Sequence, residues 1–365
     1  MEIQKLSVRR EHAYEIVLGR EIFPQIVAKI LRLRYNRQCA VVTNDVVARW
    51  YLQPLVAELR SRGFETIEIA LPDGEPHKTL DTAVSLYPRL FAAGFDRRSP
   101  LIALGGGVIG DLGGFVAATC KRGIPFIQIP TTILAMVDAS IGGKVGVNTP
   151  EGKNLVGAFY QPALVGIDVA TLKTLPLTQV AYGLVEAVKH GAIADAAYYK
   201  FILKNREAFQ ARDLDLLQRL VRRSVHIKKE IVEADELEQG PRAVLNFGHT
   251  FGHAFELLGG FRRLHHGEAV GLGMLSALAV ARGMGILKED YTASLSEFLT
   301  SFSLPTTIPR EWSIDAIIQA MVQDKKRSSD SLTLVLPTSL GRVELVPCPF
   351  ADLPRLLTPL RQLAG

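Results

Sequence analysis

The second half of the chain gathers histidines at spacings suited to metal binding. Five of the eight histidines lie in or beside motifs of this half: His190, His249, His253, His265 and His266. His249 and His253 are four residues apart and so share one face of a helix. A lone helical histidine is usually just a polar residue, but this clustering, among glycines that leave room for the backbone, predicts a metal site.

A carboxylate upstream completes a possible ligand set. Glu186 and Lys189 are three residues apart in a helical pattern and share a face. A catalytic zinc takes about three nitrogen or oxygen ligands from the protein and keeps one position open. Glu186, His249 and His266 are suited to supply them, although spacing alone leaves His249 with His253 as an equally valid pair.

A glycine-rich turn in the first half is suited to phosphate binding. Residues 105–110 read GGGVIG, which satisfies G-x-G-x-x-G between a strand pattern and a helix pattern. Such glycines let the backbone approach a pyrophosphate at a helix N-terminus. The acidic residue expected about 20 positions later, which would hold a ribose, is missing. We therefore expect the ribose contact to come from elsewhere, such as Asn44 at the end of an earlier strand, with Asp111 near the helix start.

Several cations accompany these motifs. Lys144 and Lys153 lie in glycine-flanked turns, which bring side chains and backbone close to anions, and Asn154 follows Lys153. The helical half adds Lys189, Lys228, Arg242 and Lys325. Cations gathered near a metal suit a substrate that carries both a carboxylate and a phosphate.

The patterns along the chain predict two domains. Residues 1–177 alternate short apolar strands with helices, which is typical of parallel βαβ units and of a Rossmann-like α/β domain that binds a dinucleotide. Residues 178–365 are mainly helical and are expected to bind the metal and the substrate, with the active site between the domains. The expected strands are residues 39–43, 64–71, 101–104 and 126–129, with helices at 46–62 and 79–93. The later helices are expected at 178–193, 197–210, 214–234, 248–258 and 267–282, with a hairpin at 332–346.

Composition narrows the class of protein. The 365 residues are 48% hydrophobic and 22% charged, with a net charge of +5, which suits two globular domains and an anionic small-molecule substrate. The densest basic run, residues 325–327, is too short to predict nucleic-acid binding. Three scattered cysteines, an N-terminus without a signal-peptide pattern and the lack of an apolar run of about 20 residues predict a soluble cytoplasmic protein without a membrane segment.

Six ordered motifs together resemble the 3-dehydroquinate synthases, a family of sugar phosphate cyclases. They are GGGVIGD (105–111), PTTILAMVD (130–138), IGGK (141–144), GKNL (152–155), NFGHTFGH (246–253) and HGEAV (266–270). The resemblance runs from about residue 40 to residue 346 and is far more specific than any single motif. It implies a Rossmann-like domain followed by a helical domain, a homodimer, and NAD and zinc or cobalt as cofactors.

The resemblance also implies roles for individual residues. It implies Glu186, His249 and His266 as metal ligands. Around NAD it implies Asn44, Glu75, Lys78, Gly106, Gly107, Val108, Asp111, Thr131, Thr132, Asp138, Lys153, Thr171, Thr174 and Leu175. For substrate and catalysis it implies Lys144, Asn154, Lys189, Lys228, Arg242, Asn246, His253 and Lys325, with Arg122 reaching the neighbouring subunit's site. The family lysine falls on Lys325 or Lys326, since residues 327–330 depart from the usual loop.

The implied reaction converts 3-deoxy-D-arabino-heptulosonate 7-phosphate into 3-dehydroquinate and phosphate, a step of the shikimate pathway. It proceeds by transient oxidation with NAD, phosphate elimination, re-reduction and an intramolecular aldol closure. The alternatives are another sugar phosphate cyclase, which would share the NAD turn and metal ligands, or a metal-dependent alcohol or glycerol dehydrogenase, which would release NADH. Arg242 favours 3-dehydroquinate synthase over both alternatives, because a substrate that carries a carboxylate explains the need for a guanidinium.

Overall fold

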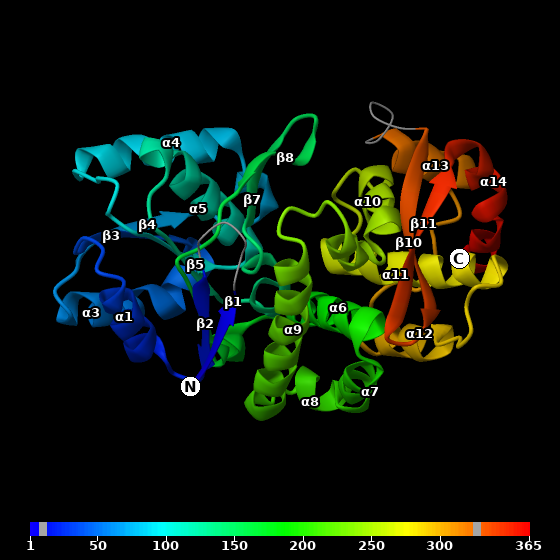
Figure 1. Cartoon of the computed structure of the whole chain (residues 1–365), viewed down its shortest axis with the longest axis horizontal. Coiled ribbons are helices and arrows are strands. Elements are labelled where there is room, and N and C mark those ends of the chain that lie inside the picture. Colours follow the sequence, from blue (N-terminus) through cyan, green and yellow to red (C-terminus); the bar gives the residue numbers. More distant parts are fainter. Residues whose placement is uncertain (7–12, 324–329) are drawn as a thin grey trace. The chain divides into compact units, whose positions relative to one another are not determined.

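The computed structural model describes residues 1–6, 13–323 and 330–365 and forms two compact units (Figure 1). Unit 1 comprises Met1–Leu175 and Leu217–Leu237, and unit 2 comprises Pro176–Leu216 and Glu238–Gly365. The predicted division placed the boundary after residue 177 and gave all later residues to the second domain. The structure differs because helix α9 (Leu214–Ala234) bonds to the first part of the chain, where Arg20 Nε donates to Gln218 Oε1 over 2.9 Å and Arg222 pairs with Glu2.

Unit 1 is built around a largely parallel sheet. Among the described residues, seven strands pair in the order β1-β2-β9-β6-β5-β3-β4. Strand β1 is antiparallel to β2, and the remaining neighbours are parallel. The strands are β1 (Glu2–Leu6), β2 (Tyr14–Gly19), β3 (Gln38–Asn44), β4 (Glu65–Leu71), β5 (Leu101–Gly105), β6 (Phe126–Pro130) and β9 (Leu164–Asp168). The predicted fold class, an N-terminal Rossmann-like α/β domain followed by a mainly helical domain, is confirmed.

Helices cover both faces of this sheet. Successive strand residues point to opposite faces of the sheet. Val42 and Ala103 therefore pack in the core with helices α4 (Leu80–Ala92) and α5 (Gly107–Thr119). Val41 and Ile102 pack in the core on the other face, with helices α1 (Phe23–Arg32) and α3 (Gln53–Ser61). The helical segments are α1 (Phe23–Arg32), α2 (Asp45–Val47), η1 (Ala48–Leu52), α3 (Gln53–Ser61), η2 (Glu75–His77), α4 (Leu80–Ala92), α5 (Gly107–Thr119), η3 (Cys120–Arg122), η4 (Ala135–Ala139) and η5 (Val169–Thr174).

A second, antiparallel pairing in unit 1 was not predicted from the sequence. Strands β7 (Lys144–Thr149) and β8 (Gly152–Phe159) form a hairpin, with Lys144 opposite Phe159 and Thr149 opposite Gly152. The residues of β8 read GKNLVGAF, in which apolar and polar residues do not alternate, so the sequence lacks the usual strand pattern. The hairpin carries Lys144, Lys153 and Asn154.

Unit 2 is mainly helical, as predicted. Its helical segments are α6 (Leu177–Ala194), α7 (Ala196–Lys204), α8 (Arg206–Gln210), η6 (Pro241–Asn246), α10 (His249–Leu258), α11 (His266–Gly283), α12 (Thr292–Ser301), α13 (Ile314–Gln323), η7 (Phe350–Asp352), α14 (Leu353–Leu356) and η8 (Thr358–Leu363). Strand β10 (Ser331–Ser339) pairs with β11 (Arg342–Pro349). The single helix expected at 197–210 is divided at Asn205, whose side chain donates to the Phe201 carbonyl over 2.7 Å. Within the described residues, no helix is long and apolar enough to cross a membrane.

Two glycines allow the helices of unit 2 to meet closely. A Cβ on Gly273 of α11 would lie 2.0 Å from the carbonyl oxygen of Gly248, the residue before α10. A Cβ on Gly267 would lie 2.6 Å from Cα of Tyr182 on α6. Any larger side chain would force these backbones apart, so the glycines bring the beginning of α10 against the middle of α11 and the beginning of α11 against α6.

Candidate active site

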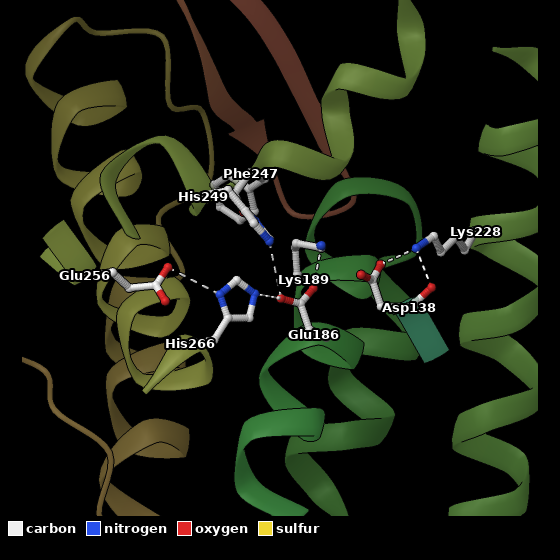
Figure 2. A network of polar contacts seen from close by, with 8 residues as sticks. All are labelled: Asp138, Glu186, Lys189, Lys228, Phe247, His249, Glu256 and His266. Carbon is white, nitrogen blue, oxygen red and sulfur yellow. Dashed lines mark hydrogen bonds and ion pairs between the residues drawn. The ribbon is translucent and has the colours of Figure 1, made fainter. Parts of the chain in front are cut away.

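The close helix packing in unit 2 brings one carboxylate and two imidazoles together (Figure 2). Glu186 lies within α6 and is fully buried, while His249 and His266 are the first residues of α10 and α11. His249 Nε2 lies 3.5 Å from Glu186 Oε1, and His266 Nε2 lies 3.6 Å from the same oxygen. Three ligand atoms at 2.0–2.1 Å from a tetrahedral zinc are about 3.4 Å apart. The donor types and their separations therefore fit a divalent metal.

The second nitrogen of each imidazole is also engaged. His249 Nδ1 lies 3.3 Å from the carbonyl oxygen of Phe247, and His266 Nδ1 lies 3.5 Å from Glu256 Oε2. Metal-bound histidines ordinarily donate their other N–H to a carbonyl or carboxylate, which fixes the ring and its tautomer. Both Nε2 atoms consequently lie beside Glu186. The sequence reasoning missed Glu256, although its position seven residues after His249 on one helix was a usable signal.

Electrostatics keep the carboxylate ionised. Burial by itself raises the pKa of Glu186, but the Lys189 ammonium and then His249 and His266 hold this pKa well below its usual range. Burial and Lys189 lower the pKa of His249 well below its usual value. Burial also lowers the pKa of His266, yet bonds to Glu186 and Glu256 outweigh it and raise that pKa to about 10. An anionic carboxylate and a neutral His249 are the protonation states that bind a metal.

The other predicted residues of unit 2 lie on α10 and on the short helix before it. His253 is exposed one turn beyond His249, with ring centroids 5.6 Å apart. Arg242 is buried in η6, with 2% of its surface exposed. Asn246 Nδ2 donates to Glu238 Oε1 over 2.8 Å, and Glu238 has a left-handed backbone with φ of 57°. Glu238 was not among the site residues predicted from the sequence. The predicted Lys325 lies outside the described residues.

In unit 1, the predicted dinucleotide residues collect at the carboxyl ends of the parallel strands. Asn44 ends β3, Gly106 caps α5 after β5, and Thr131 and Thr132 follow β6. The chain proceeds outward from β3 to β4 in one direction and from β5 through β6 to β9 in the other. A ligand in such a sheet binds where the order reverses, which here is between the ends of β3 and β5. Thr131 N donates to the Gly105 carbonyl over 2.9 Å and joins the two turns.

Asn44 and the residues after β9 are held by local contacts. The Asn44 side chain accepts from Val47 N over 2.8 Å, capping α2, and also donates to Asp73. Tyr51 OH lies 2.9 Å from the Thr171 carbonyl and 2.7 Å from Thr174 Oγ1, so it joins η1 to η5. Leu175 follows η5 and is buried.

A lysine-centred network links the glycine-turn helix to the β7–β8 hairpin. Lys78 Nζ donates to Asp111 Oδ2 over 2.5 Å and to Asn154 Oδ1 over 2.6 Å. Asn148, which was not predicted, accepts from Asn154 N over 3.0 Å and donates to Glu75 over 2.7 Å. Burial raises the pKa of Asp111, and Lys78 partly opposes this shift. The network therefore joins residues predicted to bind NAD, namely Glu75, Lys78 and Asp111, to Asn154, which was predicted to bind the substrate.

The other predicted residues of unit 1 lie on α9, η4, the β7–β8 hairpin, η3 and α5. Lys228 Nζ on α9 donates to Asp138 Oδ1 over 2.7 Å and to the Asp138 carbonyl over 2.6 Å (Figure 2). Lys144 is exposed at the beginning of β7, and Lys153 is half-buried in β8. Arg122 is exposed and has a left-handed backbone with φ of 66°. Gly107 and Val108 form the first turn of α5.

The fold is shared with solved sugar phosphate cyclases. A 2-deoxy-scyllo-inosose synthase in complex with carbaglucose-6-phosphate, NAD+ and Co2+ is 26% identical, with a TM-score of 0.86 over 98% of this chain and 99% of the other. The 2-epi-5-epi-valiolone synthase of Streptomyces hygroscopicus, with NAD+ and Zn2+ bound, is 25% identical, with the same TM-score and coverage. A butanol dehydrogenase of Thermotoga maritima, 16% identical with a TM-score of 0.69, shares the fold alone. The fold and the Glu186–His249–His266 cluster thus define a chain of the sugar phosphate cyclase class.

Sequence comparison narrows this class. Residues 68–182 match the family model described as 3-dehydroquinate synthase N-terminal, and residues 183–327 match the one described as 3-dehydroquinate synthase C-terminal. The 3-dehydroquinate synthase of Syntrophotalea carbinolica is 47% identical over 91% of each chain. That of Desulforamulus reducens is 44% identical over 91% of this chain and 93% of the relative. The chain belongs to the 3-dehydroquinate synthase family.

Proposed function

We propose that this chain converts 3-deoxy-D-arabino-heptulosonate 7-phosphate into 3-dehydroquinate and phosphate, with NAD and one zinc or cobalt ion as cofactors. The observation that carries the proposal is the cluster of buried Glu186 with partly exposed His249 and His266 in a member of this family. The alternatives, another cyclase or an alcohol dehydrogenase, are not favoured, because the 2-deoxy-scyllo-inosose synthase is 26% identical and the butanol dehydrogenase 16%, against 47% for a 3-dehydroquinate synthase.

The residues of unit 2 have distinct tasks in this proposal. Glu186, His249 and His266 would hold a divalent ion, which would supply Lewis acidity that lowers the pKa of a substrate hydroxyl. Lys189 keeps Glu186 ionised through their buried ion pair. Exposed His253 on α10 is placed to exchange a proton with substrate or water.

Two further side chains of unit 2 complete this assignment. Asn246, fixed by its hydrogen bond to Glu238, orients a polar group of the substrate. Arg242 offers the two parallel N–H donors that a carboxylate accepts.

The residues of unit 1 bind the cofactor and the phosphate. NAD held by these residues would supply a hydride acceptor that is regenerated within each turnover. Its pyrophosphate would lie over Gly106 and Gly107 at the N-terminus of α5, where unpaired N–H groups favour an anion. Lys144, Lys228 and Asn154 supply donors for the substrate's anionic and hydroxyl groups. Asp138 and Lys78 hold Lys228 and Asn154 in place before ligand binds.

A stoichiometric assay tests the proposed function. Enzyme loaded with zinc is incubated with the heptulosonate phosphate and NAD at a small fraction of the substrate concentration. We expect phosphate and dehydroquinate to form in many turnovers per NAD, with no net rise in absorbance from NADH. NADH formed in proportion to product would identify a dehydrogenase instead, and turnover of glucose 6-phosphate at a comparable rate would identify a different cyclase.

A substitution at the glycine turn tests the cofactor site. A Cβ on Gly106 would lie 3.1 Å from Thr132 Cγ2 and would occupy the approach to the backbone N–H groups. We expect Gly106→Val to weaken NAD binding by about 100-fold or more, because a pyrophosphate needs close access to the turn. Calorimetric titration with NAD measures this. Ala92→Val, a similar enlargement at an exposed residue of α4, should bind NAD normally; unchanged affinity in Gly106→Val would refute the placement.

The proposal extends to a homodimer in the cytoplasm. Exposed apolar side chains on α4 and β8 support an interface in unit 1: Val84, Phe91, Leu155 and Phe159 are 51%, 50%, 56% and 47% exposed. The free, buried cysteines Cys39, Cys120 and Cys348 support a reducing compartment. Light scattering should report a dimer that Phe159→Asp dissociates and Leu345→Asp, on the unit 2 hairpin, leaves intact.

A further inference from the structure

A buried acid on α10, Glu256, is not among the residues proposed to bind the metal, the substrate or NAD. Glu256 is 2% exposed, and its Oε2 lies 3.5 Å from Nδ1 of His266 (Figure 2). Burying a carboxylate is costly unless a hydrogen-bonded partner compensates for it. Its position seven residues after His249 places both side chains on one face of α10. This face contacts α11, whose first residue is His266.

We propose that Glu256 is a positioning residue that orients His266 for metal binding; this inference rests on the proposed function. Glu256 Oε2 accepts the Nδ1 proton of His266, so Nε2 is the nitrogen that lies beside Glu186, 3.6 Å from its Oε1, where the metal would bind. A fixed tautomer and ring angle raise the affinity of such a ligand. His249 obtains the same restraint from a backbone carbonyl, that of Phe247. His266 is therefore the ligand whose orientation depends on another side chain.

The geometry predicts an order among substitutions at Glu256. Alanine removes the acceptor, and we expect zinc affinity to fall about 10- to 100-fold. Glutamine keeps an acceptor oxygen at the same reach and should lose clearly less. Aspartate keeps the charge but withdraws the oxygen by one methylene, about 1.5 Å, so it should resemble alanine. A role through charge alone predicts the opposite order, with aspartate better than glutamine.

The experiment measures metal binding rather than turnover. Full-length protein is stripped with EDTA, and zinc affinity is determined by competition with a chromophoric chelator. The visible spectrum of the cobalt-loaded protein reports ligand geometry and should change in the alanine and aspartate variants. Glu311→Ala is the matched control, because Glu311 is an exposed acid of unit 2 paired with Arg263. Thermal unfolding in EDTA checks that each variant is folded.

Each result decides a separate question. Affinities within twofold of wild type for the aspartate and alanine variants, or aspartate binding more tightly than glutamine, would overturn the inference. If the alanine variant does not fold, the order of glutamine and aspartate still decides. Wild-type protein that binds zinc but makes no dehydroquinate would refute the proposed function and leave the positioning role to be judged by affinity. Wild-type protein that binds no zinc would refute both.

Discussion

His249→Ala and His266→Ala should each lose the metal and lower kcat/KM by about three orders of magnitude or more. Each change removes one of three protein ligands whose donor atoms lie within 4.8 Å of one another. A catalytic site needs about three such ligands to retain zinc. The Lewis acidity lost with the ion is worth several kcal/mol, and about 4 kcal/mol corresponds to a factor of about 1,000. Metal content after dialysis and steady-state kinetics measure the two effects.

The controls separate ligand loss from general damage. His226→Ala alters a partly exposed histidine on α9 that lies 3.3 Å from Glu230, and it should retain metal and activity. Glu186→Gln keeps the shape of the third ligand, so metal affinity should fall by a smaller margin. It also removes the charge that faces buried Lys189, so the free energy of unfolding should fall as well. Full metal occupancy in either alanine variant would show that the ligand assignment is wrong.

Arg242→Lys should cost roughly 2 to 4 kcal/mol of transition-state binding, or about 30- to 900-fold in kcat/KM. A guanidinium binds a carboxylate through two parallel hydrogen bonds, a geometry that an ammonium does not reproduce. Arg242 is 2% exposed, so water would compensate little for a mismatched partner. The proposed heptulosonate substrate has a carboxylate, whereas neutral sugar phosphates have none. The loss should therefore appear with the heptulosonate phosphate, as measured by phosphate release under steady-state conditions.

Two comparisons make this result specific to the carboxylate. Arg263→Lys exchanges the same groups at an exposed residue of unit 2 that pairs with Glu311, and it should leave kcat/KM unchanged. Wild-type enzyme should turn over glucose 6-phosphate or sedoheptulose 7-phosphate far more slowly than the heptulosonate. An unaltered kcat/KM in Arg242→Lys, or comparable wild-type turnover of a neutral sugar phosphate, would contradict the substrate assignment.

The positions of helices depend on residues that are close together in the chain, and they were predictable from the sequence. The helices expected at 178–193, 214–234 and 267–282 occur as α6, α9 and α11, each end within one residue of the prediction. Their periodic apolar residues and flanking glycines are local signals that survive folding. The family also followed from the sequence, because six ordered motifs retain their spacing whatever the tertiary arrangement.

Features set by contacts between distant residues were decided by the tertiary structure. The order β9-β6-β5-β3-β4, and with it the reversal between β3 and β5 beside Asn44 and Gly106, depends on which strands pair across long loops. Nothing in the residues around Asn148 distinguishes it from an ordinary polar position, and the spacing of Glu256 from His249 does not reveal which imidazole Glu256 contacts. Their roles arise only where folding places Asn148 against Asn154 and Glu256 against His266. The sequence by itself therefore determined the helices, the family and the candidate ligand types. The three-dimensional packing decided which side chains hold those ligands in place, because hydrogen bonds form between atoms that are close in space, however far apart they are in the chain.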